Sequence, residues 1–274
     1  RPALAHRRRA HLKALTMLLS ALALFAAQAA EVATAAPRTA EAARLSECLQ
    51  QARTDPATAI TTAGLWLNEA HDAGRALPQQ CLGHAYSSLL RWPAAHDAFL
   101  AARDAALPSD YAVRARLGAM AGNAALGGND FAAALADLER ARADADLAGD
   151  KPLAGSIAAD KARALVALKR IDEAAAALQQ ARADAPQDAQ VWLLSATLSR
   201  RLGDLKSAQA QIEVAAGLAP TDPAIGLEAG VIAELAGNDE AARKSWNAVV
   251  AVAPATTEAA SAKAYLAQVG NSAQ

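Results

Sequence analysis

Residues 189–222 have the sequence AQVWLLSATLSRRLGDLKSAQAQIEVAAGLAPTD. On both sides of Gly203-Asp204, apolar residues recur at intervals of three and four, which is the spacing of one face of an α-helix. Glycine and aspartate between two such stretches are typical of a turn. Pro220 marks the point where the second stretch stops, because proline interrupts a helix interior. The stretch therefore predicts a hairpin of two antiparallel helices.

The same pattern recurs in the neighbouring sequence with a period of 34 residues. Prolines, small residues and bulky apolar residues each return to the same place in successive units: Pro186, Pro220 and Pro254; Ala174, Ala208 and Ala242; Leu178, Ile212 and Trp246; Ala181, Ala215 and Val249. A fixed period of this kind is the signature of a repeat array, in which stacked neighbours bury one continuous core. Small residues let the helix backbones approach, and the bulky residues fill the space between them.

The composition of the whole chain agrees with closely packed helices. Of the 274 residues 53% are hydrophobic but only 4% aromatic, and much of the apolar share is alanine, a strong helix former. The formal net charge is -1, which excludes the strongly basic footprint of a nucleic-acid-binding protein. Residues 31–274 hold 22 basic and 28 acidic side chains, so the body of the protein is mildly acidic.

The first 30 residues have the order of a secretory signal peptide. Arg7-Arg8-Arg9 and Lys13 precede an apolar run over residues 14–27, and Ala27-Gln28-Ala29 follows as a small-x-small cleavage pattern. The run is shorter than the roughly 20 apolar residues that a membrane-spanning helix needs. We therefore expect a cleaved signal peptide over residues 1–30, a linker over 31–38, and a periplasmic or secreted protein. The alternative is an uncleaved N-terminal anchor.

The repeats resemble the tetratricopeptide-repeat family. Two stretches reproduce the family's pattern: Leu82-Gly83, Tyr86, Ala95, Phe99, Ala102 and Pro108 in one unit, and Trp192, Ala208, Ala215 and Pro220 in a later one. The resemblance implies an all-α fold, a right-handed α-solenoid of antiparallel helix hairpins. We assign five units, 76–109, 115–148, 155–188, 189–222 and 223–256, with a degenerate N-terminal helix hairpin over 39–73 and a C-terminal capping helix over 257–269.

Unit 115–148 departs from the pattern. It has Asp146 where the family has proline, and Ala148-Gly149-Asp150-Lys151-Pro152 follows. We expect a loop over these five residues before the next unit begins.

No pattern of catalytic or metal-binding residues is present. The five histidines are scattered and form no H-x-x-x-H motif, and neither C-x-x-C, G-x-S-x-G nor a P-loop occurs. His71-Asp72 and His96-Asp97 are adjacent pairs, but neighbours on a helix point in different directions, so we interpret them as solvated polar faces. We predict that the protein is not an enzyme and has no cofactor and no metal.

The resemblance implies a non-catalytic protein-protein interaction scaffold that binds a peptide or partner protein in a concave groove, lined by the first helix of each unit. The family's groove places fall here on Gln80, His84, Arg116, Asn123, Arg163, Gln190, Thr197, Arg200 and Glu234. Most are uncharged donors or cations, which favours a polar groove with a basic bias and an acidic or amide-rich peptide. The alternative for the arginines is a merely solvated surface.

A second class of function is an architectural or assembly factor in envelope biogenesis, acting in outer-membrane, peptidoglycan or cytochrome maturation, and an enzyme is the third class. We expect a protein or peptide partner and no nucleic acid. Contact with a membrane is expected only through the signal peptide, and no oligomeric state follows from the sequence.

Cys48 and Cys81 are the only cysteines and lie 33 residues apart, close to one repeat length. Equivalent places in the first helices of adjacent hairpins are neighbours in a solenoid, and export would place both thiols where disulfides persist. We therefore predict a disulfide between them. The alternative is a pair of buried free thiols.

We predict export with cleavage near Ala29 or Ala30, because the basic, apolar and small-residue segments follow one another in the order of a signal peptide. N-terminal sequencing of protein isolated from the producing cell measures this. A mature chain that still contains Arg7-Arg8-Arg9 would contradict the prediction.

Overall fold

The computed structural model describes residues 40–271, so the expected signal peptide and linker lie outside the described residues. Residues 40–54 are helical. The helices that follow are α2 (Pro56–Glu69), α3 (Ala76–Ser88), α4 (Trp92–Ala105), α5 (Tyr111–Gly127), α6 (Phe131–Ala148), α7 (Lys151–Ala167), α8 (Ile171–Asp184), α9 (Ala189–Arg201), α10 (Leu205–Leu218), α11 (Pro223–Leu235), α12 (Asp239–Val252) and α13 (Thr257–Asn271). One turn of 3-10 helix, η1 (Asp72–Arg75), lies before α3.

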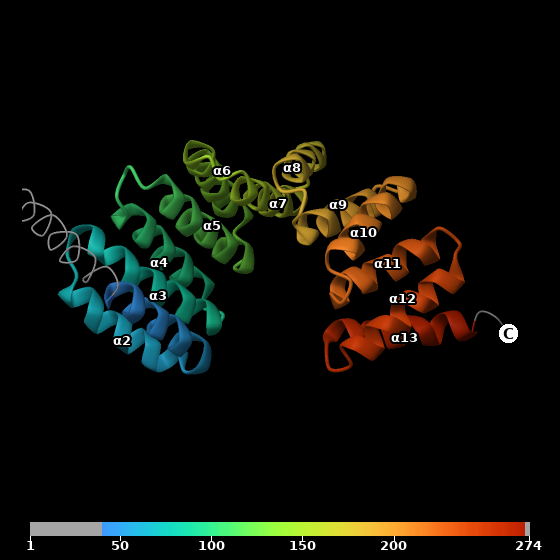
Figure 1. Ribbon diagram of the computed structural model, residues 1–274, viewed down its shortest axis with the longest axis horizontal. Helices are drawn as coiled ribbons and strands as arrows, with labels where there is room; N and C mark the ends of the chain where they lie inside the picture. The colour runs from blue at the N-terminus through green and yellow to red at the C-terminus, as the bar shows by residue number, and fades with distance from the viewer. Residues whose placement is uncertain (1–39, 272–274) are drawn as a thin grey trace, which may run out of the picture.

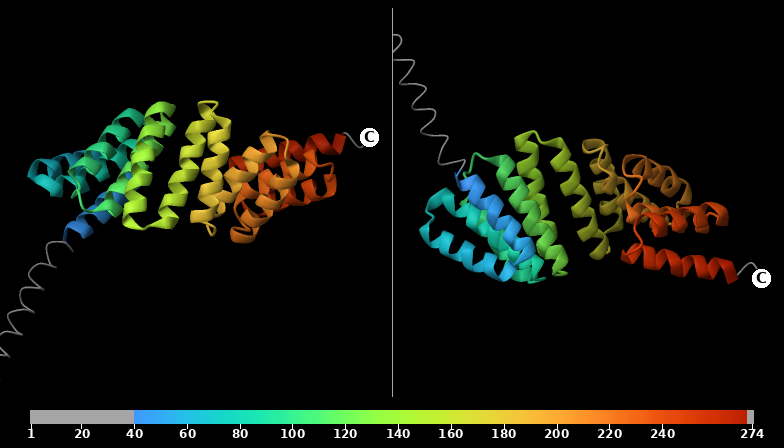
Figure 2. Two further views of the ribbon diagram at one scale, coloured as in Figure 1. Left: turned by 90° about the horizontal axis from the view of Figure 1, so that it is seen from above. Right: turned by 60° about the horizontal axis from the view of Figure 1, so that its bottom comes forward.

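Consecutive helices pair into hairpins, and the hairpins stack in chain order into an arch (Figures 1 and 2). The blue N-terminal hairpin and the red α13 lie at opposite ends of the arch. The predicted all-α, right-handed solenoid of antiparallel helix hairpins is confirmed. Within residues 40–271, no helix is both long and apolar enough to cross a membrane.

The second and third units begin earlier than predicted. α5 starts at Tyr111 and α7 at Lys151, each before the expected first residue at 115 or 155. The predicted loop over residues 148–152 is wrong, because only Gly149 and Asp150 separate α6 from α7. Gly149 ends α6 with a left-handed φ of 69°, and the Asp150 carboxylate caps α7 by accepting a hydrogen bond from the Leu153 amide. Pro152 falls in the first helical turn, where proline is tolerated.

Within several hairpins a glycine of the first helix lies directly against the bulky residue of the second. A Cβ atom on Gly122 would lie 2.6 Å from Cγ of Leu138, and one on Gly230 would overlap the indole of Trp246. Trp246 is fully buried, and its Nε1–H donates to the Leu227 carbonyl oxygen at 3.2 Å. At these crossings the bulky side chain of the second helix therefore fits only because the facing residue of the first helix is small.

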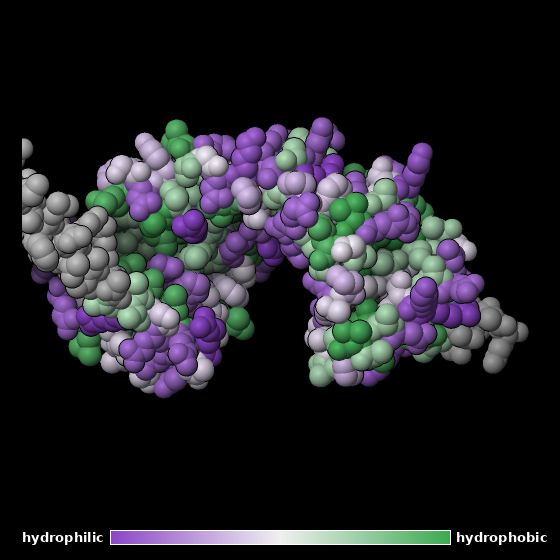
Figure 3. Space-filling view, viewed as in Figure 1, coloured by the Kyte–Doolittle hydropathy of each residue, from purple (hydrophilic) through white to green (hydrophobic). Residues whose placement is uncertain are grey.

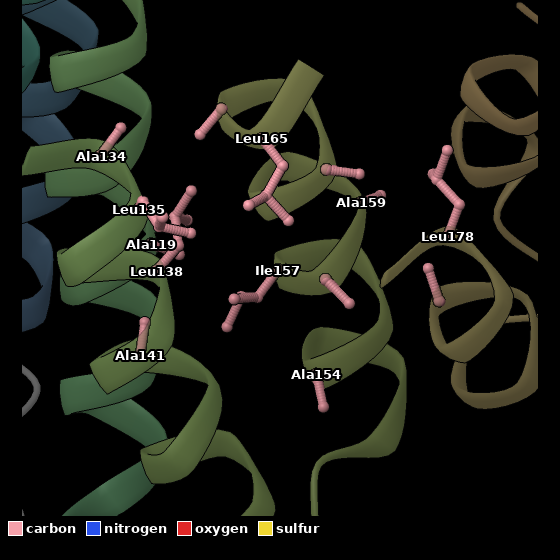
Figure 4. Packing of buried hydrophobic residues seen from close by; sticks show 14 of the residues in the cluster. Ala119, Ala134, Leu135, Leu138, Ala141, Ala154, Ile157, Ala159, Leu165 and Leu178 are labelled. Carbon is pink, nitrogen blue, oxygen red and sulfur yellow. The ribbon is translucent and has the colours of Figure 1, made fainter. Parts of the chain in front are cut away.

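The buried core runs from one hairpin into the next. The largest group of buried apolar residues spans α5 to α9. On α7, Ile157 points toward the α5–α6 hairpin, whereas Ala159 points to the opposite side, where Leu178 of α8 lies (Figure 4). Each inner helix thus has two packed sides, so a hairpin is stabilised by its neighbours.

Ion pairs connect the second helices of the first three assigned units, α4, α6 and α8. Arg103 of α4 donates from Nη2 to Asp144 Oδ2 of α6 at 2.6 Å, and Arg142 of α6 donates in the same way to Asp184 of α8 at 2.6 Å. The Arg103 and Asp144 side chains are only 10% and 9% exposed. The residue that follows Asp184 by one repeat of 34 is Leu218, so this series of pairs stops before α10.

In the next junction, Arg182 of α8 donates from Nη1 to the buried Ser195 hydroxyl of α9 at 2.8 Å, and its guanidinium lies over the Trp192 ring. Burial lowers the pKa of Arg182. Among consecutive helices from α2 to α13, α8 and α9 are in the least extensive contact. The junction between the third and fourth units is therefore the most thinly packed in the described chain.

The N-terminal hairpin is tied to the first unit by a disulfide. Cys48 in the helix over residues 40–54 is bonded to Cys81 of α3, with their Cα atoms 6.0 Å apart. Both residues are buried. The bond crosses from the degenerate hairpin to its neighbour and so fixes the end of the solenoid that matches the repeat pattern least.

We expect free-thiol titration of the denatured, unreduced protein to find no reactive group. Replacing both residues, Cys48→Ala with Cys81→Ala, should lower the free energy of unfolding by about 3–4 kcal/mol, the entropy of closing a loop of this size. Urea unfolding of the two proteins measures the difference. Two reactive thiols in the unreduced chain would contradict the bridge.

Candidate functional site

The first helices of the hairpins form the inner surface in the middle of the arch. In Figure 1, α5 and α7 lie on the inner side, and α6 and α8 lie on the outer side. All nine predicted groove residues are on the first helices α3, α5, α7, α9 and α11. Figure 3 shows hydrophilic and hydrophobic residues interleaved on the face it presents.

Three of the predicted residues gather around the middle of this surface. Asn123 of α5 donates from Nδ2 to Asp160 Oδ2 at 2.7 Å, and Arg163 of α7 donates from Nη1 to the other oxygen of the same carboxylate at 3.1 Å. Thr197 of α9 lines the same cleft as Arg163. The structure therefore connects α5, α7 and α9 through Asn123, Arg163 and Thr197, with Asp160 between the first two.

The predicted arginines are paired with carboxylates. Arg200 of α9 makes a two-point contact with Glu228 of α11, from Nε to Oε1 at 2.6 Å and from Nη2 to Oε2 at 3.3 Å. Arg116 lies 3.7 Å from Asp150, and Arg163 bonds Asp160. The basic bias of the groove is thus smaller than residue types alone indicate, because each of these three arginines has a carboxylate neighbour.

The remaining predicted residues lie toward the ends of the groove. His84 is half-buried and packs edge-on against Phe99, with ring centroids 5.2 Å apart. Burial, and then the positive charge of Arg53, lower the pKa of His84. Gln80 is half-buried, whereas Gln190 and Glu234 are exposed. The structure does not bring these four residues into one cluster with Arg163.

A cleft of about 350 Å³ opens between α7 and α9, where the contact between the third and fourth units is thinnest. Leu178 of α8 lies in its lining, and the other lining residues are Ala159, Ala162, Arg163, Val166, Ala167, Leu194, Thr197, Leu198 and Arg201. Alanines on the α7 side leave space that larger residues would fill. The interior is mainly apolar, and Arg163, Thr197 and Arg201 supply its polar groups.

Sequence reasoning identified Arg163 and Thr197 but missed Arg201 and the apolar lining. It also missed Asp160 and Glu228, the two carboxylates that orient the groove donors. These two acids lie two repeats apart in the same place of their units, and each faces a donor of the preceding unit. Because both acids occupy the same position of the 34-residue repeat, an aligned comparison of the units could have identified them.

The interpretation of the His96-Asp97 pair as a solvated polar face is wrong for His96. Its side chain is 20% exposed, and its Nε2 lies 2.6 Å from Oδ2 of the buried Asp137, on α6. Asp137 also pairs with Arg140. The histidine therefore joins α4 to α6, as the Arg103–Asp144 pair does. No group of three or more potential metal ligands occurs within residues 40–271.

Comparison with known proteins gives a family match and a set of similar folds. A family model described as tetratricopeptide repeat matches residues 119–189 and 159–223. No curated protein matches the sequence.

Three solved structures share the fold at low sequence identity. PilF of Pseudomonas aeruginosa is 14% identical, with 84% of this chain and 98% of that chain covered and a TM-score of 0.64. PilW, a widely conserved type IV pilus biogenesis factor, is 18% identical, with 80% and 96% covered and a TM-score of 0.63. BtubC from P. vanneervenii is 15% identical, with 76% and 91% covered and a TM-score of 0.60. At these identities the likeness establishes the fold alone.

Proposed function

We propose that this chain, whose residues 119–223 are tetratricopeptide repeats within a solenoid of the same kind, is a non-catalytic interaction scaffold that binds a peptide segment of a partner protein. The segment would lie in the groove formed by the first helices. The observation that carries this proposal is the set of polar side chains bonded around Asp160 on α5 and α7, beside a mainly apolar cleft between α7 and α9. A concave surface that combines an apolar pocket with a few placed polar groups is the usual form of a binding site.

The paired carboxylates support this proposal because they hold the donors in place before a ligand arrives. Asp160 fixes Asn123 and Arg163, and Glu228 fixes the Arg200 guanidinium. A guanidinium has five N–H donors, so Arg200 keeps donors for a ligand after its contacts with Glu228 are made. Donors that are already ordered lose less conformational entropy on binding.

We also place the protein in the periplasm or outside the cell. The order of basic, apolar and small residues over residues 1–30 supports this location. The buried Cys48–Cys81 disulfide agrees with it, because disulfides persist in oxidising compartments.

The alternative is an assembly factor of the cell envelope. It is favoured by the fold shared with PilW, a type IV pilus biogenesis factor, over 96% of that chain. The two functions differ in the expected partner: a scaffold of this kind captures a short peptide, whereas an assembly factor remains with a large complex when envelope fractions are separated.

The proposal is tested by selecting binders to the purified protein from a displayed library of random peptides. The double substitution Asn123→Ala with Arg163→Ala should lower the affinity of the selected peptides by at least about tenfold, or about 1.4 kcal/mol, because both donors of the α5–α7 surface are lost. Fluorescence anisotropy measures the affinities, and circular dichroism should be unchanged, since exposed charges contribute little to folding.

The matched control is Gln179→Ala with Lys244→Ala, which removes an amide and a cation from exposed places on α8 and α12. This variant should bind as the unchanged protein does. A library that yields no binders, or affinities unaffected by loss of Asn123 and Arg163, would overturn the proposed groove.

A further inference from the structure

We infer that the cleft between α7 and α9 is an anchor pocket for one large apolar side chain, aromatic or leucine, carried by an acidic segment of a partner protein. This inference rests on the proposed function and specifies the chemistry of the ligand and the place where it is held.

The interior of the cleft fits an apolar group. Its lining includes Leu178 and Leu198, which are 3% and 7% exposed, and the half-buried Val166 and Leu194. Its volume of about 350 Å³ lies in the range of sites that enclose small ligands or side chains. Burying one large side chain in such a pocket is how a few residues supply most of the energy of an interface.

The polar groups of the cleft favour acidic residues beside the apolar anchor. Arg163 and Arg201 both line it, toward the C-terminal ends of α7 and α9. The carboxylate of Asp160, which pairs with Arg163, also accepts a hydrogen bond from Asn123. Arg201 is exposed, and among residues 40–271 no carboxylate lies within ion-pair distance of it. An approaching carboxylate therefore meets one guanidinium that is unpaired and a second that is only partly neutralised.

The position of the cleft in the solenoid explains why it is open. The Arg–Asp pairs that connect α4 to α6 and α6 to α8 have no counterpart between α8 and α10, where Leu218 replaces the acid. Packed interiors normally leave few voids. A side chain inserted between α7 and α9 would supply the contacts that this junction lacks, so binding should also raise the temperature of unfolding.

The probes for the test are peptides selected from the random library on the unchanged protein. We expect the selected sequences to share an aromatic residue or leucine flanked by aspartate or glutamate. Ala167→Trp fills the cleft from an exposed position, and Arg201→Glu reverses the unpaired charge. Each substitution should lower the affinity of these peptides for the protein by at least about tenfold. The matched controls, Ala175→Trp on α8 and Lys244→Glu on α12, are exposed and lie outside the cleft, and they should leave affinity unchanged.

The outcomes separate this inference from the proposed function. Selected peptides that need Asn123 and Arg163 but tolerate both Ala167→Trp and Arg201→Glu would overturn the anchor pocket and leave the groove in place. Selected peptides without an apolar residue, or with basic flanks, would also overturn it. So would a concentration-dependent dimer that Ala167→Trp dissociates, because a second copy would then occupy the cleft.

Discussion

The close approach of the two helices in each hairpin is the constraint on which the rest of the structure depends. A bulky side chain of the second helix fills the space against the first only where the first helix carries a residue with little or no side chain. At Gly230 the Trp246 indole occupies the volume that a Cβ atom would take, and at Gly122 Leu138 does the same. The requirement is met by glycine in the α3–α4, α5–α6 and α11–α12 hairpins, and its recurrence contributes to the period in the sequence.

Stability and binding are distributed differently along the solenoid. The N-terminal hairpin is held by the Cys48–Cys81 disulfide, and buried ion pairs such as Arg103–Asp144 connect the second helices that follow. Breaking such a pair is costly, because it leaves a buried charge uncompensated. At the α8–α9 junction the Arg182 guanidinium instead donates a hydrogen bond to a neutral acceptor, the Ser195 hydroxyl. The cleft between α7 and α9 lies beside this junction, so the least extensive contact between consecutive helices coincides with room for a ligand.

The hairpins, their order and the small and bulky columns were predictable from the sequence, because they follow from contacts within one repeat. The early start of α7 was not predicted, because Pro152 suggested a loop, whereas the Asp150 cap lets proline occupy the first helical turn. The cleft and the pairing of Arg200 with Glu228 were missed for a different reason: they depend on how one hairpin is rotated against the next. The family resemblance placed the groove on the first helices, but only the packing between hairpins shows which charges are neutralised.

The central claim is tested most directly by adding one methyl group at a crossing point. Gly230→Ala should lower the free energy of unfolding by about 1–3 kcal/mol, because the new Cβ atom has no space beside Trp246. Gly64→Ala in the middle of α2, where a Cβ atom meets nothing within 4 Å, should instead raise it by about 0.5–1 kcal/mol through helix propensity. Urea unfolding of the two variants measures both values. If Gly230→Ala is as stable as Gly64→Ala, the close approach of the helices is not the constraint that holds the solenoid together.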